Sequence, residues 1–284
     1  MNNIITAGIV TFNPDLDRLK ENVSAILPQV DKVVLFDNGS INQKSIELEY
    51  QNSAIIIKSD RNVGIAAALN GLMKKSEELG ATWMLSLDQD SVCSRDFCEQ
   101  MGIYLYKEDN FGIVAPVIVD RNVGIVGHNP EKEYKSVRTC ITSGAFTRLD
   151  VWKQIGGYDE SMFIDSVDFE FCYRVRKFGY QVIQVRDVQL LHELGNSEKK
   201  RFLFWEIDVT GHSAFRKYYI ARNNVYYPLK HKLWLHFIRG FFRNIELVVI
   251  TILYEEDKKN KIVQIIKGSV EGLGSRRDLD DNRH

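Results

Sequence analysis

The sequence predicts an α/β protein, with a mainly parallel sheet flanked by helices and a helical extension at the C-terminal end. Two observations lead to this prediction. Apolar, β-branched runs alternate with helix-periodic segments through the first half of the chain. From about residue 207 onward the pattern is mostly helical. We therefore expect a domain at residues 1–205 and a helical region at 206–284, for which 284 residues suffice.

The first half justifies the parallel sheet element by element. Helical spacing of apolar residues predicts helices at Asp15–Ile26 and Ile65–Leu79, and Gly80 is the expected C-cap of the second. Strands and helices in this rhythm are typical of βαβ units. The predicted strands, in order, are Ile4–Thr11, Lys32–Phe36, Ala54–Lys58 and Trp83–Leu87.

The second half changes rhythm after Phe111. Two short pieces, Asp120–Gly127 and Tyr134–Thr139, look antiparallel, and the polar segment Gly272–His284 is expected to be a frayed tail. The other predicted elements are a strand at Phe111–Val119, a helix at Asp168–Phe178 and a strand at Gln181–Val185.

Composition excludes several classes of protein. The chain is 44% hydrophobic and carries a net charge of −1, so it buries a core and is not a polyanion binder as a whole. Its four cysteines form no CxxC pair, which disfavours a zinc ribbon or a disulfide framework and favours a reducing compartment. The N-terminus lacks a basic signal-peptide region, and no apolar run is long enough to span a membrane. We expect a cytoplasmic protein.

Polar clusters follow three of the predicted strands: Thr11-Phe12-Asn13, Asp37-Asn38-Gly39-Ser40 and Asp88-Gln89-Asp90. Each cluster alone is an ordinary turn signal. In open α/β sheets, however, ligands bind beyond the carboxyl ends of the strands. Three clusters at one edge therefore predict a binding crevice.

Two of the loops carry specific chemistry. Asp88 and Asp90 stand two residues apart after an apolar strand, so both carboxylates can reach one Mg²⁺ or Mn²⁺ ion, which prefer oxygen ligands shared with phosphates. The alternative is a solvated acidic turn. In Arg61-Asn62-Val63-Gly64, the glycine permits close approach to a ligand, and the free N–H groups of the following helix favour a phosphate. The alternative is a loop that needs glycine for its geometry only.

A candidate general base lies in the segment from Phe163 to Glu170. It contains Asp165, Asp168 and Glu170, and a carboxylate on a rigid element can take a proton from a hydroxyl group. Asp168 stands at or near the start of a predicted helix, where aspartate is also favoured simply as an N-cap.

These motifs together resemble glycosyltransferase family 2, and most closely its rhamnosyltransferase-like branch, from about residue 4 to about residue 225. The family implies a GT-A fold, an inverting mechanism, a divalent metal and a nucleotide-sugar donor, with dTDP-rhamnose favoured over a UDP-sugar by the segment Phe163–Tyr173. The acceptor would be a glycan or a lipid-linked glycan. The motifs, in order, are TFNP, DNGS, RNVGIAAALNGL, DQD, TSGAFTR, GGYDESMFIDSVDFEFCYRVRKFGY and HELG.

The resemblance also implies roles for individual residues. Asp168 matches the family's base, although Val167 stands where the commonest pattern has glutamate. Asp88 serves the donor and the metal, Asp90 serves the metal, and a histidine at the position of His192 can complete that site. Asp165, Gly144 and Gly157 are expected near the acceptor, where turn chemistry is an equal explanation for the glycines. The residues expected to contact the donor are Thr11, Asp37, Arg61, Asn62, Gly64 and Asn70.

The C-terminal region suggests a surface for a partner. Residues 215–250 contain seven basic residues against one acidic residue, interleaved with aromatic side chains. This mixture favours contact with an anionic membrane at the inner face of the cell membrane. A helix pair with a basic outer face and a homodimer interface are the alternatives, and nucleic acid is disfavoured because no recognised nucleic-acid module accompanies the region.

Two other classes of function remain as rivals. The segment Met84–Val92 resembles the nucleophile strand of a haloacid-dehalogenase-like phosphatase, with Asp88 as nucleophile and Asp90 as acid/base. Those enzymes carry this strand early, whereas three βα units precede it here. A non-catalytic module that binds glycans or nucleotide sugars is the second rival, since fold alone does not fix function.

Overall fold

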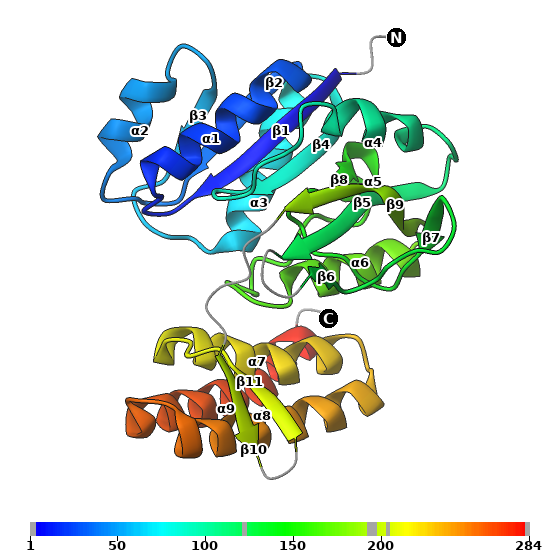
Figure 1. The fold of residues 1–284 in the computed structure, drawn as a ribbon. Helices are drawn as coiled ribbons and strands as arrows, with labels where there is room; N and C mark the ends of the chain where they lie inside the picture. Colours follow the sequence, from blue (N-terminus) through cyan, green and yellow to red (C-terminus); the bar gives the residue numbers. More distant parts are fainter. Residues whose placement is uncertain (1–3, 121–123, 192–197, 203–204, 282–284) are drawn as a thin grey trace. The chain divides into compact units, whose positions relative to one another are not determined.

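The computed structural model describes residues 4–120, 124–191, 198–202 and 205–281. The chain forms two compact units (Figure 1). The first contains residues 1–161 and 167–193, and the second contains residues 162–166 and 194–284. Among the residues that the structure describes, no helix is both long and apolar enough to cross a membrane.

The first unit is built on a nine-stranded sheet in the described part of the chain. Its strand order is β3-β2-β1-β4-β8-β5-β9-β7, and β6 pairs with β5. Helices flank this sheet, as Figure 1 shows, so the predicted α/β class is confirmed. The strands are β1 (Ile4–Thr11), β2 (Lys32–Asp37), β3 (Ile55–Lys58), β4 (Ala81–Asp88), β5 (Phe111–Asp120), β6 (Gly124–Val126), β7 (Tyr134–Ser136), β8 (Phe146–Arg148) and β9 (Gln181–Leu191).

The parallel part of the sheet brings the predicted polar clusters to one edge. β1 pairs in parallel with both β2 and β4, and β2 pairs in parallel with β3. Thr11 lies opposite Asp37, and Val10 lies opposite Asp88. The carboxyl ends of three strands therefore meet at the edge where α/β sheets bind their ligands.

Beyond β4 the sheet is mixed. β8 runs antiparallel to both β4 and β5, and β5 and β9 are parallel to each other. The strand β8 has only three residues and follows Gly144, so it carries no alternating pattern by which it could be predicted.

Local sequence explains the helices of the first unit. Asp15 caps the start of α1, where its carboxylate accepts hydrogen bonds from the backbone N–H groups of Asp17 and Arg18. The apolar face of this helix is buried through Leu19 and Val23. The predicted stop at Gly80 is also found, with φ of 77° just after the last turn of α3. The helices are α1 (Leu16–Ile26), the 3₁₀ turn η1 (Leu27–Gln29), α2 (Gln43–Tyr50), α3 (Ile65–Glu78), α4 (Phe97–Leu105), α5 (Leu149–Gln154) and α6 (Val167–Lys177).

The second unit consists of a hairpin and three helices in its described residues. The hairpin pairs β10 (Glu198–Phe202) with β11 (Trp205–Val209), and the helices are α7 (Ala214–Lys230), α8 (Trp234–Tyr254) and α9 (Lys258–Asp281). The helical pattern expected from about residue 207 begins at Ala214, because the hairpin runs to Val209.

The expected frayed tail at Gly272–His284 is wrong up to Asp281, where α9 ends. Gly268 and Gly272 explain how the helix is held. A Cβ atom on Gly268 would lie 2.2 Å from the Tyr218 carbonyl oxygen, and one on Gly272 would lie 2.6 Å from that of Arg222. Glycine at both positions lets α9 approach the backbone of α7.

Candidate active site

Thr11 and Asp37 meet at the ends of β1 and β2, as predicted. Both are fully buried, and the Thr11 hydroxyl lies 3.5 Å from Asp37 Oδ1. Asp37 Oδ1 also accepts from the Ser40 backbone N–H at 3.2 Å, and Oδ2 accepts from the Gln43 side-chain amide at 2.6 Å. These bonds fix the carboxylate at the sheet edge without a charged partner among them.

The loop Arg61–Gly64 lies against the turn after β2. The Asn38 side chain donates to Asn62 Oδ1 at 3.1 Å and accepts from the Val63 N–H at 2.8 Å. Gly39 has φ of 81°, and a Cβ atom there would lie 2.5 Å from the Arg61 carbonyl carbon. Glycine at this turn therefore permits the two loops to touch.

Gly64 sets the start of α3. It has φ of 87° and is the N-cap of the helix, and its N–H donates to Asn62 Oδ1 at 2.9 Å. The first helical N–H groups of α3 have no side-chain cap at this N-cap. A helix start of this kind is suited to the phosphate groups of a nucleotide donor.

The Asp88-Gln89-Asp90 segment is tied down by its neighbours. The Asp88 backbone N–H donates to Ser143 Oγ at 3.2 Å, and the Asp88 carbonyl accepts from the Asn22 side-chain amide at 2.6 Å. Gln89 Oε1 accepts from the Phe12 N–H at 2.9 Å, which joins this segment to the end of β1. Asp88 is half-buried and Asp90 is exposed, so both residues of the predicted metal site are accessible to solvent at this edge of the sheet.

The residues present fit a divalent ion in part. Two carboxylates on a tethered turn supply hard oxygen ligands, and Mg²⁺ commonly takes one or two carboxylates together with substrate phosphates and water. Within the described ranges, no group of three or more His, Cys, Asp or Glu side chains is arranged to hold a metal ion. His192, the predicted third ligand, lies outside the described residues. The metal site stays a prediction.

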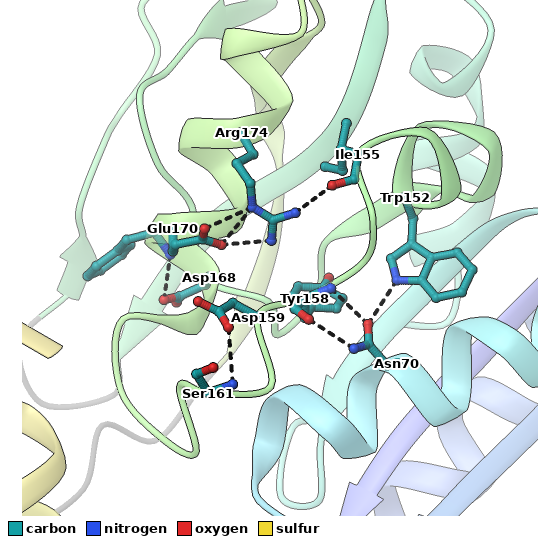
Figure 2. Close-up of polar contacts among 10 residues, drawn as sticks. Asn70, Trp152, Ile155, Tyr158, Asp159, Ser161, Asp168, Glu170 and Arg174 are labelled. Atoms are coloured by element: carbon teal, nitrogen blue, oxygen red, sulfur yellow. Dashed lines mark hydrogen bonds and ion pairs between the residues drawn. The ribbon is translucent and has the colours of Figure 1, made fainter. Parts of the chain in front are cut away.

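Asp168 lies in the first turn of α6, which begins one residue earlier at Val167 (Figure 2). Its Oδ1 accepts from the Phe169 N–H at 2.9 Å. A carboxylate in the first turn of a helix is favoured as the anion by the helix dipole. The role of Asp168 as the general base stays a prediction.

Glu170, the third acid of this segment, has a structural role. It is fully buried and forms an ion pair with Arg174, whose Nη2 lies 2.7 Å from Glu170 Oε2. Arg174 also donates to the Ile155 carbonyl at 2.8 Å, as Figure 2 shows. This pair anchors α6 to the loop after α5 and holds the helix that carries Asp168.

Asp165 belongs to the second unit, where it is held from two sides. Its carboxylate pairs with Arg216, with Nη2 at 3.0 Å from Oδ1 and Nε at 3.2 Å from Oδ2. Asn223 donates to the carbonyl groups of both Ile164 and Asp165 at 2.8 Å. Asp165 and Ser166 both have positive φ, 66° and 62°, a conformation that non-glycine residues keep only when their surroundings enforce it. The acceptor role predicted for Asp165 stays a prediction, and its carboxylate already has a cationic partner.

Asn70 uses its whole side-chain amide within the protein. Its Oδ1 accepts from Trp152 Nε1 at 3.0 Å and from the Tyr158 N–H at 2.8 Å. Its Nδ2 donates to the Tyr158 carbonyl at 2.9 Å and to Glu160 Oε1 at 2.8 Å. An amide side chain has two acceptor and two donor positions, and all four are filled. Figure 2 shows the contacts with Trp152 and Tyr158. The predicted donor contact stays a prediction, whereas the geometry indicates a bridge between α3 and the loop at 156–160.

The two predicted acceptor glycines have clear packing reasons. Gly157 has φ of 73°, and a Cβ atom there would lie 2.8 Å from Asn70 Oδ1. Gly144 has φ of 78°, and a Cβ atom there would lie 2.8 Å from Leu190 Cδ2. Turn geometry therefore accounts for both glycines, and their acceptor contacts stay predictions.

We expect Asn70→Ala to lower the free energy of unfolding by about 2–4 kcal/mol, because Trp152 Nε1 and the Tyr158 backbone lose their partners. Thermal or urea unfolding measures this, and Lys74→Ala on the exposed side of the same helix is the matched control. A variant with unchanged stability but weaker nucleotide-sugar binding would contradict the bridging role and favour the predicted donor contact.

Sequence reasoning missed three long-range contacts, made by the side chains of Asn22, Gln89 and Ser143. Each joins Asp88 or Gln89 to another part of the chain, across 66, 77 and 55 residues of sequence respectively. No local pattern marks such long-range polar contacts. The only available signal was that Gln89 and Ser143 lie inside the motifs DQD and TSGAFTR.

Comparison with known proteins identifies the family of the chain. Residues 6–173 match the family model described as glycosyl transferase family 2. The chain is 32% identical over 239 residues to the dTDP-rhamnosyl transferase RfbF of Shigella flexneri, covering 78% of this chain and 79% of that protein. It is 22% identical over 293 residues to the low-salt glycan biosynthesis hexosyltransferase Agl10 of Haloferax volcanii, covering 95% and 91%.

Solved structures show the same fold. TarS 1–349 of S. aureus in complex with UDP-GlcNAc superposes with a TM-score of 0.64 at 13% identity, covering 98% of this chain and 83% of that one. GalNAc-T7 with UDP, GalNAc and Mn²⁺ gives a TM-score of 0.59 at 14% identity, covering 81% of this chain. This chain spans half the length of that GalNAc-T7 chain.

Proposed function

Because the chain belongs to glycosyltransferase family 2, we propose that it is an inverting, metal-dependent enzyme that transfers L-rhamnose from dTDP-rhamnose to a glycan or lipid-linked acceptor. The proposed process is the synthesis of a bacterial surface polysaccharide. Support for the donor comes from the relative described as a dTDP-rhamnosyl transferase, at 32% identity. The alternative donor is a UDP-hexose, which the hexosyltransferase Agl10 and the UDP-GlcNAc complex of TarS favour.

One observation carries the proposal. Thr11, Asp37, the loop Arg61–Gly64 and Asp88 lie at the carboxyl edge of parallel strands, in the same compact unit as Asp168. The buried Thr11–Asp37 pair would bind the base or ribose of the nucleotide, and the start of α3 would receive phosphate oxygens. The donor end and the base of a sugar transfer are thus both available in one unit.

The proposed chemistry is a single displacement. Asp168 takes the proton from the acceptor hydroxyl, and the hydroxyl oxygen attacks the anomeric carbon as the diphosphate leaves. One base suffices for this inversion, whereas retention by double displacement would need a second carboxylate as nucleophile close to the anomeric carbon. Asp88 and Asp90 would hold a Mg²⁺ or Mn²⁺ ion, which neutralises the charge that develops on the diphosphate.

The rival functions are less well supported. The family match spans residues 6–173, a range that contains Asp88, Asp90 and Asp168, and it favours a transferase over a haloacid-dehalogenase-like phosphatase.

The proposed location is the cytoplasm, at the inner face of the cell membrane, because a lipid-linked acceptor would be reached there. The alternative use of the C-terminal region is as the interface of a homodimer.

Calorimetric titration with dTDP-rhamnose, UDP-glucose and UDP-GlcNAc, with and without Mn²⁺ or Mg²⁺, tests the proposal. We expect metal-dependent binding, tightest for dTDP-rhamnose. Tightest binding of a UDP-sugar would refute the donor and keep the transferase. No binding under any condition would refute the donor site itself, while binding without transfer to any acceptor would favour the non-catalytic module.

A further inference from the structure

Helix α8 carries a continuous apolar face that is exposed to solvent. Trp234 is 56% exposed, Leu235 73% and Phe242 63%. Spacings of three and four residues place such side chains on one side of a helix. The exposed apolar residues of α8 are Trp234, Leu235, Ile238, Phe241, Phe242, Ile245, Val249, Ile252 and Leu253.

The opposite face of α8 is fixed against α7. A Cβ atom on Gly240 would lie 1.9 Å from the Asn224 carbonyl oxygen, so the two backbones are in close contact there. Asn244, which is buried, donates to the Ala221 carbonyl and to Ser269 Oγ, both at 2.9 Å. Turning the apolar face inward would break these contacts, so its exposure is a fixed property of the helix.

Helix α9 adds a second exposed apolar stripe to the same unit. Val263, Ile266, Val270 and Leu273 follow one another at intervals of three and four residues, and each is exposed. Single exposed apolar residues are common on soluble proteins, but runs of this extent mark interaction sites. The second unit therefore has a partner surface, whose main part is α8.

Charge indicates what covers this surface. Between residues 230 and 254 there are four cations, Lys230, Lys232, Arg239 and Arg243, against the single carboxylate of Glu246. Arginine and lysine side chains beside an apolar face can reach phosphate groups while the face enters the acyl region. A self-pairing of this face around a two-fold axis would instead bring its cations near their own copies.

The structure also pairs three of the basic residues expected on the surface at 215–250 with acidic residues of the same unit. Lys217 is buried and lies 2.7 Å from Glu255, and Arg216 pairs with Asp165. Arg222 is buried and lies 3.4 Å from Glu271. Arg216, Lys217 and Arg222 of α7 thus serve ion pairs within the second unit, so the candidate membrane surface is α8 rather than the whole segment.

We propose that the outer face of α8, with the exposed stripe of α9, binds an anionic lipid bilayer, with α8 lying along its surface. Tryptophan at the first position of α8 and phenylalanine at positions 241 and 242 are side chains that the interface between headgroups and acyl chains favours. This inference deepens the proposed function, since a lipid-linked acceptor brings the enzyme to a bilayer, but its evidence is the α8 surface alone.

Vesicle sedimentation of the full chain tests the proposal. Vesicles of phosphatidylcholine with phosphatidylglycerol are compared with vesicles of phosphatidylcholine alone. We expect binding to the anionic vesicles, a loss of roughly tenfold or more in partitioning for Phe241→Ser with Phe242→Ser, and loss of the anionic preference for Arg239→Gln with Arg243→Gln. Leu48→Ser with Ile103→Ser, at positions on α2 and α4 that are at least as exposed as the two phenylalanines, is the control and should sediment like the unaltered protein.

Two results would overturn the inference. One is equal sedimentation of the phenylalanine variant and the unaltered protein. The other is a dimer in light scattering that the phenylalanine substitutions dissociate, with no vesicle binding, which would assign the surface to a second copy. Circular dichroism checks that each variant is folded. Calorimetry of nucleotide-sugar binding separates this inference from the proposed function. We expect the α8 variants to bind the donor like the unaltered protein. If the unaltered protein binds no donor but still binds anionic vesicles, the proposed function fails and the membrane surface stands.

Discussion

Replacing Asp168 with asparagine is expected to lower kcat for sugar transfer by on the order of 10²–10⁴-fold, with little change in nucleotide-sugar affinity. Asparagine keeps the size of the side chain and the oxygen that accepts the Phe169 N–H, but it cannot take a proton. Steady-state kinetics with the acceptor, and calorimetry with the donor, measure the two quantities separately.

Asp150→Asn is the control, and its stability effect includes the loss of a surface ion pair with Arg148. Asp150 also lies in the first turn of a helix of the same unit, and its Oδ1 likewise accepts from the next backbone N–H, that of Val151, at 2.7 Å. If both aspartates served only their helices, both substitutions would have similar small effects on stability and none on kcat. A kcat for Asp168→Asn within a few-fold of the control would remove Asp168 as the base.

Thermal stability distinguishes a lost proton acceptor from a damaged α6 as the cause of a lower kcat. Glu170 and Arg174 hold α6 by a buried ion pair, and loss of one partner of such a pair is destabilising. A damaged α6 would therefore lower thermal stability together with activity. The unfolding midpoint of Asp168→Asn should stay close to that of Asp150→Asn, which leaves the lost proton acceptor as the cause.

The donor side of the site could be predicted because its information is local. Buried strands such as Trp83–Leu87 end in polar turns, and parallel pairing brings the ends of β1, β2 and β4 to one edge. Thr11 and Asp37 were expected at that edge and are found in contact across two paired strands. Period-two and helical patterns, with the turn residues between them, determine this part of the fold.

The remainder depends on contacts between distant residues. The strand β8 is too short to show a period, and its place between β4 and β5 follows from tertiary pairing. Asp165 and Arg216 lie 51 residues apart, and nothing near either position indicates that they pair. Counting charges likewise included Lys217 in the basic surface expected at 215–250, whereas it is buried beside Glu255 because an ion pair compensates its charge.

Asp90→Ala is expected to abolish the metal dependence of donor binding and to lower transfer by about 100-fold or more, because a metal bound at the diphosphate supplies several kcal/mol to the transition state. Asp90 is exposed in the turn after β4, so its removal leaves the sheet and the tether from Gln89 to Phe12 intact. The expected result is donor binding that Mn²⁺ no longer strengthens. Calorimetry with and without Mn²⁺ measures it, and transfer assays with a chelator complete the comparison.

Asp109→Ala is the control for this variant, since Asp109 is an exposed acid in the turn before β5 of the same unit. Removing it changes the net charge equally, so any general electrostatic effect on an anionic donor appears in both variants. If Asp90→Ala keeps the full Mn²⁺ response, Asp90 is a solvated turn residue and the metal, if required, is held elsewhere. A general effect of removing one negative charge would raise the affinity for the anionic donor in both variants, so an equal change in both would indicate surface charge rather than coordination. Only a selective loss in Asp90→Ala identifies a carboxylate that acts through a metal ion.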